Sequence, residues 1–161
     1  MTVNYGKKFE GIIREAFEKV PNVSIDRLHD QTTGFKGSQN ICDFIVYREP
    51  YEYYFECKSV HGNTLPFSNI TDKQWNGLLQ KSQIDGVFAG VICWWIDHDK
   101  TVFIPIQELA FMELVGMKSV RYDAIDDCDG DTTMIEIKGK KKRVFFDYDM
   151  EEFLNEIQSN R

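Results

Sequence analysis

The N-terminal part of the chain has a helical spacing of apolar residues, which then changes to a β-like spacing. The apolar positions are Phe9, Ile12, Ile13, Ala16, Phe17 and Val20. This i, i+3, i+4, i+7 series is typical of an amphipathic helix with one face on a core. Pro21 and Asn22 end the helix, and residues 23–28 have the character of a short strand. The polar residues that follow, up to Asn40, predict an exposed loop.

Two runs rich in aromatic and β-branched residues, 41–47 and 52–59, predict a pair of strands. Only residues 48–51 separate them, so we expect a hairpin. Further along, Thr71 is followed three residues later by Gln74, which is the signature of a capping box. A second helix is therefore predicted to begin near residue 72.

The almost wholly apolar run 87–96 predicts a central strand that is covered on both faces. Residues 101–104 follow as its expected antiparallel partner. Pro105 is suited to open a short helix that continues to Leu114. These elements place the centre of a sheet in the middle of the chain.

The C-terminal part predicts further strands and a closing helix. We expect strands at 134–137 and 144–146, with a turn at 138–142 between them. An amphipathic helix follows, for which Asp149 is the predicted cap. Together the patterns predict one mixed α/β domain over residues 1–161, with a central sheet flanked by helices.

Composition narrows the class of protein. No run of about 18 apolar residues occurs, so no membrane partner is predicted and a cytoplasmic location is expected, in the host cell if a phage encodes the chain. The four cysteines form no CxxC pair, which disfavours a zinc site or a disulfide framework. The net charge of −7 opposes nonspecific nucleic-acid binding, although acidic residues crowd 123–131 and basic residues crowd 138–143.

Candidate chemistry lies in the predicted hairpin. Glu56 and Lys58 project from the same side of their strand because side chains alternate between faces. If Tyr47 pairs with Glu52, counting back places Asp43 opposite Glu56. Two opposed carboxylates destabilise a sheet unless something compensates, and Mg²⁺ commonly binds one or two carboxylates. Lys58 would then orient or help to deprotonate a metal-bound water.

A simpler interpretation is that Asp43 and Glu56 are surface acids and that Lys58 forms an ordinary salt bridge with them. The apolar neighbours favour the metal site, since they indicate a buried strand pair in which unpaired acids are costly. These neighbours are Ile41, Phe44, Ile45, Phe55 and Cys57.

A longer pattern adds a family resemblance. Asp43 followed by Glu56-Cys57-Lys58 resembles the core of the PD-(D/E)XK nuclease superfamily. The stretch after it is similar to RecU-type Holliday-junction resolvases of Gram-positive bacteria and their phages. The matching positions are Thr64, Pro66, Phe67, Asn69, Ile70 and Gln74. The opening residues 6–10 also resemble that family's first helix, and the likeness covers roughly residues 4–110.

The resemblance implies a restriction-endonuclease-like fold and a homodimer that cuts four-way DNA junctions with Mg²⁺, or alternatively Mn²⁺. Asp43, Glu56 and the carbonyl of Cys57 would hold the metal. Gln74 and Glu10 would assist, while a capping role for Gln74 and an ordinary solvated position for Glu10 stay open.

The chain departs from the family in being short and acidic, with little room before Asp43 for a projecting stalk. If the loop 31–40 replaces that stalk, Arg27, Lys36 and the backbone of Gly34 and Gly37 become candidates for contacting DNA. A loop without function is the alternative for each of them. The basic segment 138–143 is a candidate for contacting DNA arms, or else a solvated hairpin tip.

Two other functions remain open at this stage. One is an endonuclease of the same fold that acts on other DNA substrates. The other is a DNA-binding modulator of recombination that keeps the fold without cutting. Junction cleavage, and its loss in Asp43→Asn, would distinguish these from the leading hypothesis.

Overall fold

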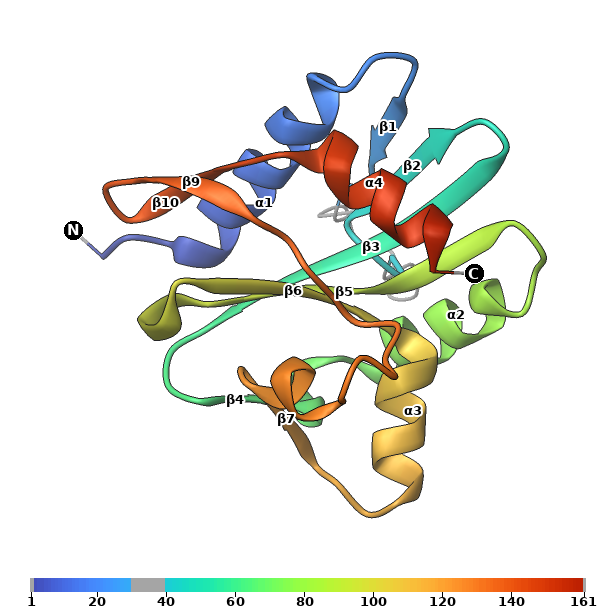
Figure 1. The fold of residues 1–161 in the computed structure, drawn as a ribbon, viewed down its shortest axis with the longest axis vertical. Helices are drawn as coiled ribbons and strands as arrows, with labels where there is room; N and C mark the ends of the chain where they lie inside the picture. Colours follow the sequence, from blue (N-terminus) through green and yellow to red (C-terminus); the bar gives the residue numbers. More distant parts are fainter. Residues whose placement is uncertain (1, 30–39, 161) are drawn as a thin grey trace, which may run out of the picture.

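The computed structural model describes residues 2–29 and 40–160. A six-stranded sheet crosses the centre of the protein in the order β1-β2-β3-β5-β6-β8 (Figure 1). Its strands are β1 (Ser24–Arg27), β2 (Phe44–Arg48), β3 (Tyr51–Val60), β5 (Val87–Trp95), β6 (Lys100–Pro105) and β8 (Ile135–Glu136). Strands β3 and β5 run parallel, whereas the other neighbours in this sheet are antiparallel. The predicted antiparallel pairing of the central apolar strand with the next one is confirmed.

Helices cover both faces of the sheet (Figure 1). On one side lie α1 (Tyr5–Glu18) and α4 (Met150–Ser159), and on the other lie α2 (Asp72–Ser82) and α3 (Ile106–Leu114). Short elements complete the fold: β4 (Thr64–Pro66), β7 (Ser119–Arg121), η1 (Phe67–Asn69), η2 (Ile96–His98) and η3 (Ala124–Asp127). The mixed α/β class is confirmed, and no described helix is long and apolar enough to cross a bilayer.

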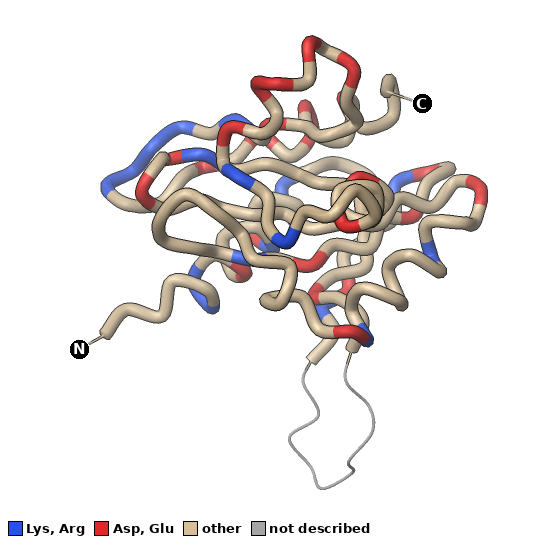
Figure 2. Tube along the Cα trace, turned by 90° about the horizontal axis from the view of Figure 1, so that it is seen from below, with Lys and Arg blue, Asp and Glu red and all other residues tan. Residues whose placement is uncertain are grey.

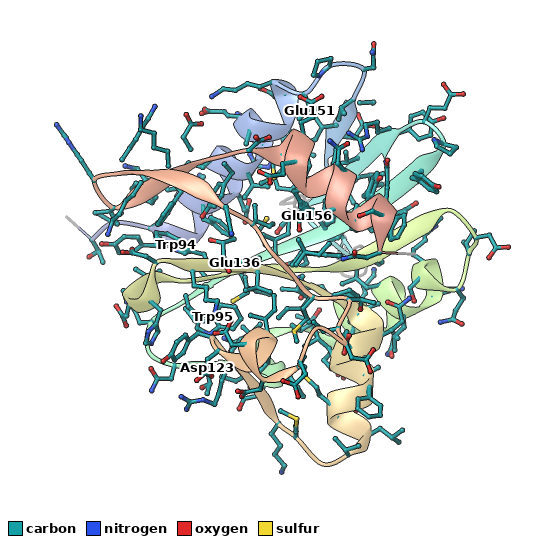
Figure 3. All side chains as sticks on the ribbon, viewed as in Figure 1. Trp94, Trp95, Asp123, Glu136, Glu151 and Glu156 are labelled. Atoms are coloured by element: carbon teal, nitrogen blue, oxygen red, sulfur yellow. The ribbon has the colours of Figure 1, made fainter. Side chains whose placement is uncertain are left out.

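Strand alternation divides the interior into two cores. Trp94 and Trp95 are consecutive on β5 and point to opposite faces of the sheet (Figure 3). Trp94 joins the core under α1 and α4, where Phe9 and Phe153 are buried. Trp95 joins the core under α2 and α3, with Leu78. Strand β5 is therefore apolar on both faces, as its sequence predicted.

The predicted turn at 138–142 is wrong. Residues Gly139–Lys142 form a strand, β9, which pairs with β10 (Phe145–Tyr148) in a separate two-stranded sheet. The turn lies instead at residues 143–144, directly after β9, and Arg143 there has a positive φ of 61°. Every residue of β9 is exposed, so this strand needs no apolar alternation, and the alternation rule therefore missed it.

Candidate active site

The β2–β3 hairpin brings Asp43 to the candidate site. Tyr47 pairs with Glu52 as predicted, and the ladder continues to Phe44 and Phe55. One residue earlier the regular pairing stops, and the Asp43 amide donates to the Phe55 carbonyl at 3.0 Å. The Asp43 side chain turns to β3, where its Oδ2 accepts a hydrogen bond from the Cys57 amide at 2.8 Å. This bond holds the carboxylate beside the backbone that joins Glu56 to Lys58.

Glu56 lies at the centre of the cluster and is only 4% exposed. Its Oε1 accepts a hydrogen bond from Gln74 Nε2 at 2.9 Å and lies 3.2 Å from Lys58 Nζ. Its Oε2 is buried and has no hydrogen-bond partner among the described residues. A buried carboxylate oxygen without a partner is costly, so this atom is available for a ligand.

Burial and charge make ionisation of Glu56 unfavourable. They raise its pKa to about 8, chiefly through loss of solvent and then through the nearby charge of Asp43, whereas Lys58 acts in the opposite direction. Without a further cation, the site therefore favours protonation of Glu56 near neutral pH. A bound cation would favour the ionised form.

Gln74 belongs to the first turn of α2 and is oriented by the start of that helix. Its amide N–H donates to the Thr71 hydroxyl at 3.2 Å, and its side-chain Oε1 accepts from the Thr71 amide at 3.0 Å. The capping box is thus confirmed. Because Oε1 is occupied, Nε2 faces Glu56, and the capping role and the site contact coexist.

Glu10 and Arg27 meet at the edge of the cluster. Glu10 extends from α1, and its Oε2 lies 3.2 Å from Nη2 of Arg27 on β1, with both side chains about one-third exposed or less. Glu10 is also among the charges that raise the pKa of Glu56. The structure therefore brings both predicted residues to the site. The predicted contacts of Gly34, Lys36 and Gly37 lie outside the described residues.

The cysteines near the site behave as buried thiols. Cys57 packs into the core under α1, away from Glu56, as strand alternation predicted. Burial, followed by the charges of Glu56 and Asp43, raises the pKa of Cys42 to about 12. The pKa of Cys57 is also raised well above its ordinary value by burial and by the same two charges. Both thiols therefore stay protonated near neutral pH.

The donor set fits a hard divalent cation. Two carboxylates, one of them with an oxygen that has no partner among the described residues, suit Mg²⁺ or Mn²⁺, which take one or two protein carboxylates and complete their shell with water and phosphate. Within residues 2–29 and 40–160 no cluster of three or more His, Cys, Asp or Glu side chains is arranged to enclose a metal.

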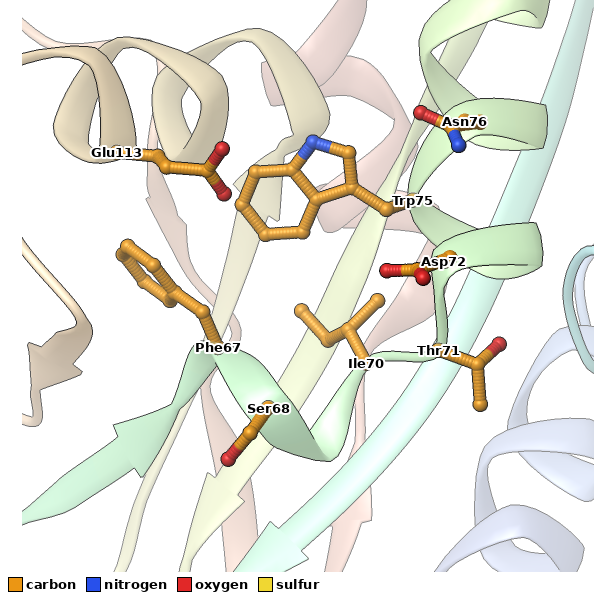
Figure 4. Close-up of a pocket in the computed structure, with 8 residues that line it drawn as sticks. All are labelled: Phe67, Ser68, Ile70, Thr71, Asp72, Trp75, Asn76 and Glu113. Atoms are coloured by element: carbon orange, nitrogen blue, oxygen red, sulfur yellow. The ribbon is translucent and has the colours of Figure 1, made fainter.

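A separate open cavity of about 600 Å³ lies at the start of α2 (Figure 4). Phe67 and Trp75 supply its aromatic walls, and Glu113 reaches toward the Trp75 ring from α3. Thr71 and Asp72 line its edge, but none of the carboxylates of the cluster does. The cavity is therefore distinct from the candidate site.

Comparison with known proteins now identifies the family. The sequence profile of RecU, Recombination protein U, matches residues 4–148. The chain belongs to the RecU family. This confirms the predicted resemblance and, with it, the assignment to Holliday-junction resolution in recombination. No curated protein sequence matches the chain.

Among solved structures, the RecU-family chain is similar to Archaeoglobus fulgidus Hjc, a Holliday junction resolvase from an archaeal hyperthermophile. The two share 16% sequence identity, and the match covers 63% of this chain and 74% of that one, with a TM-score of 0.42. The family of this chain is therefore assigned from the RecU sequence match and not from this structural similarity.

Sequence reasoning missed two contacts that shape the site. The first is the Cys57 amide, which fixes Asp43 through a backbone bond that no residue pattern reveals. The second is the pairing of Arg27 with Glu10, which joins residues assigned to separate roles. The sequence shows that Glu10 and Arg27 carry opposite charges on neighbouring elements. Their ion pair could not be predicted from it, because the pair depends on how α1 lies across β1.

Proposed function

We propose that this RecU-family protein cuts four-way DNA junctions by metal-dependent phosphodiester hydrolysis at the Asp43–Glu56 site. The observation that carries this proposal is the buried Glu56 carboxylate, which has one oxygen held by Gln74 and Lys58 and the other without a partner in the part of the chain that the structure describes. A buried carboxylate beside a second carboxylate is costly unless a cation compensates it.

Asp43, Glu56 and the Cys57 carbonyl would hold Mg²⁺, with Mn²⁺ as the alternative. When bound, the metal lowers the pKa of water and stabilises charge on the phosphate. The chain itself supplies the positioning. The Cys57 amide fixes Asp43, and Gln74 fixes Glu56, so that both carboxylates are oriented before DNA arrives.

Lys58 places a positive charge beside Glu56 on the face that the two carboxylates share. We assign to it the orientation of the attacking water. As the water oxygen bonds to phosphorus, the bond to the leaving sugar oxygen breaks, the water releases a proton to solvent and the leaving oxygen takes one up from solvent. Glu10 and Arg27 form the outer edge of the site. There Glu10 assists by its charge, and Arg27 is placed to approach a phosphate.

The proposal is tested by cleavage of a synthetic four-way junction with Mg²⁺. Wild-type protein should make paired nicks and should leave linear duplex of the same sequence largely uncut. Asp43→Asn keeps the shape of the side chain but removes its charge, so cleavage should fall by about a hundredfold or more. Equal cutting of the linear duplex would favour an endonuclease of other substrates, and no cleavage sensitive to Asp43→Asn would favour a DNA-binding modulator.

We also propose that two copies act together through the end of α3. Four large apolar side chains between residues 111 and 117 are exposed: Phe111, Leu114, Val115 and Met117. An exposed apolar cluster of this size on a small protein indicates a contact surface. Glu113 lies within this segment and Lys118 directly follows it, and both line one hollow with Met117. This mixture of charges suits a two-fold contact in which each patch meets the same patch of a second copy.

A further inference from the structure

The hairpin β9–β10 carries a concentrated positive charge that the proposed chemistry does not use. Five of the six residues at 138–143 are basic, none is acidic, and all six are exposed. In Figure 2 this hairpin forms a marked stretch of blue along the tube, close to segments coloured red. The net charge of the chain is −7, but because these basic residues are gathered in one hairpin, that hairpin can attract anions locally.

Much of this charge is not neutralised within the protein. Lys141 lies 2.6 Å from Asp99, and Lys142 lies 3.4 Å from Asp147. Lys138, Lys140 and Arg143 form no ion pair with any part of the chain that the structure describes. Exposed pairs are weak and easily exchanged, so all five side chains are available to an external anion.

The hairpin is held firmly against the body of the protein. Phe145 packs beside Trp94, with ring centroids 5.6 Å apart, and beside Tyr5 at 6.1 Å. The hydroxyl of buried Tyr148 shares a hydrogen bond of 2.7 Å with Thr101 of β6. The basic side chains therefore project from a fixed frame, which lowers the entropy cost of ordering them on a ligand.

The hairpin also adjoins the helix that leads to the active site. Lys8 of α1 lies over the Phe145 ring at 5.1 Å, and Glu10 of the site cluster follows two residues later. Two residues advance a helix by about 3 Å along its axis and turn it by about 200°, so Lys8 and Glu10 are close along α1 but project from different sides of it. One turn of duplex DNA spans roughly 34 Å, so an arm that enters the site could extend over the hairpin.

We propose that the β9–β10 hairpin, together with Lys8, binds the phosphate backbone of a duplex arm of the junction. Lysine and arginine contacts of this kind position DNA without reading its sequence. The proposal rests on the proposed function for the identity of the substrate. It adds the surface that lets an acidic protein hold DNA while the site cuts it.

The test compares two triple variants that each remove three positive charges. Lys138→Gln/Lys140→Gln/Arg143→Gln alters the hairpin without breaking an ion pair of the described residues. Arg48→Gln/Lys81→Gln/Arg121→Gln is the control, because these residues lie at the end of β2, on α2 and on β7, away from the hairpin and from the proposed two-fold contact. Binding to a fluorescent junction and to linear duplex is measured at several salt concentrations in an Asp43→Asn background, in which the DNA stays uncut.

The hairpin variant should bind both DNAs about tenfold or more weakly than the control, and the slope of log K against log salt should fall by about 2 to 3. Its single-turnover cleavage rate, measured with Asp43 intact and with saturating enzyme, should not change. An affinity and salt slope equal to those of the control would overturn the proposal. So would a loss of saturating rate without a loss of affinity.

The binding assay tests the hairpin proposal and the cleavage assay tests the proposed function, so either proposal can be contradicted without the other. If wild-type protein does not cut the junction, the proposed function is wrong. The binding comparison still decides whether the hairpin holds duplex DNA, because it does not depend on cutting. Matching thermal midpoints for the two triple variants establish that the folded state is intact.

Discussion

Glu56 shows at the scale of a single residue how the site balances burial against charge. Its position beside Lys58 follows from strand alternation and could be predicted from the sequence. Its Oε1 has two partners, whereas its Oε2 has none in the described part of the chain. That difference between the two oxygens depends on three-dimensional packing, and we expect it to make Glu56 sensitive to both pH and metal.

The contribution of Glu56 to the stability of the metal-free protein should therefore fall as pH rises. The pKa of Glu56 is ordinarily near 4.5 and is raised to about 8 in the folded state, so folding favours the protonated acid. The resulting penalty is absent below about pH 4.5, grows as pH rises and is complete near pH 8. In metal-free buffer, the free energy of unfolding of wild type minus that of Glu56→Gln should fall by up to about 5 kcal/mol across this range.

Urea unfolding at a series of pH values measures this difference, and the subtraction removes the contribution of other titrating groups. Added Mg²⁺ should stabilise wild type more at pH 8 than at pH 6, since it binds the ionised acid. A difference that stays constant with pH would contradict the burial and charge assigned to Glu56.

Gln74→Glu separates the two roles of Gln74. Glutamate at this position keeps the capping box, so α2 should stay folded. The hydrogen-bond donor to Glu56 is lost and a negative charge replaces it. Because a hydrogen bond to a charged group contributes about 1.5–3 kcal/mol, kcat on the junction should fall by about tenfold or more. An unchanged kcat would assign Gln74 to capping alone.

At the scale of elements, helix α2 must pack closely against the residues that precede β2 in order to bring Gln74 to Glu56. Gly77 allows this, because a Cβ there would lie 2.7 Å from the Cβ of Ile41, which precedes β2. By contrast, Gly11 of α1 has open space around it. The two glycines look alike in the sequence, and their different surroundings became evident only from the packing.

Alanine substitution should therefore have opposite effects at these two positions. Gly11→Ala should raise the free energy of unfolding by about 0.5–1 kcal/mol, because alanine favours a helix over glycine. Gly77→Ala should lower stability and also reduce junction cleavage, since it displaces α2 and with it Gln74. Thermal unfolding and kcat measured for both variants test this, and equal gains in stability would show that α2 is not constrained by Ile41.

The sequence predicted some elements better than others. The helices at α1, α2 and α4 have strong periodicity or caps, and these local signals were sufficient. Strand β9 was predicted as a turn because its exposed lysines have no apolar alternation. Strands β4 and β7 were not predicted, because each has three residues and is paired with a segment distant in the chain.

At the scale of the whole molecule, the order of the sheet could not be counted from the sequence. The parallel β3–β5 pair depends on the crossover through α2, and no local pattern specifies which strands become neighbours. The family resemblance, in contrast, was predicted from the motif residues between 41 and 76 and is confirmed by the match over residues 4–148.

The proposed two-fold contact predicts a change in assembly. Leu114 is 83% exposed, and Leu114→Glu should convert a dimer into a monomer by placing like charges across the axis. Ile84→Glu is the matched control, because Ile84 is 52% exposed but lies outside the 111–117 segment. Sedimentation analysis of the two variants and wild type measures the mass. A dimer that survives Leu114→Glu would place the contact elsewhere.

The metal site itself is the central claim, and diffraction from crystals soaked in Mn²⁺ tests it most directly. The account predicts an anomalous peak within about 2.0–2.3 Å of oxygens from both Asp43 and Glu56, with no such peak in Asp43→Asn. A peak bound elsewhere, or Asp43 and Glu56 left without metal at saturating Mn²⁺, would contradict it.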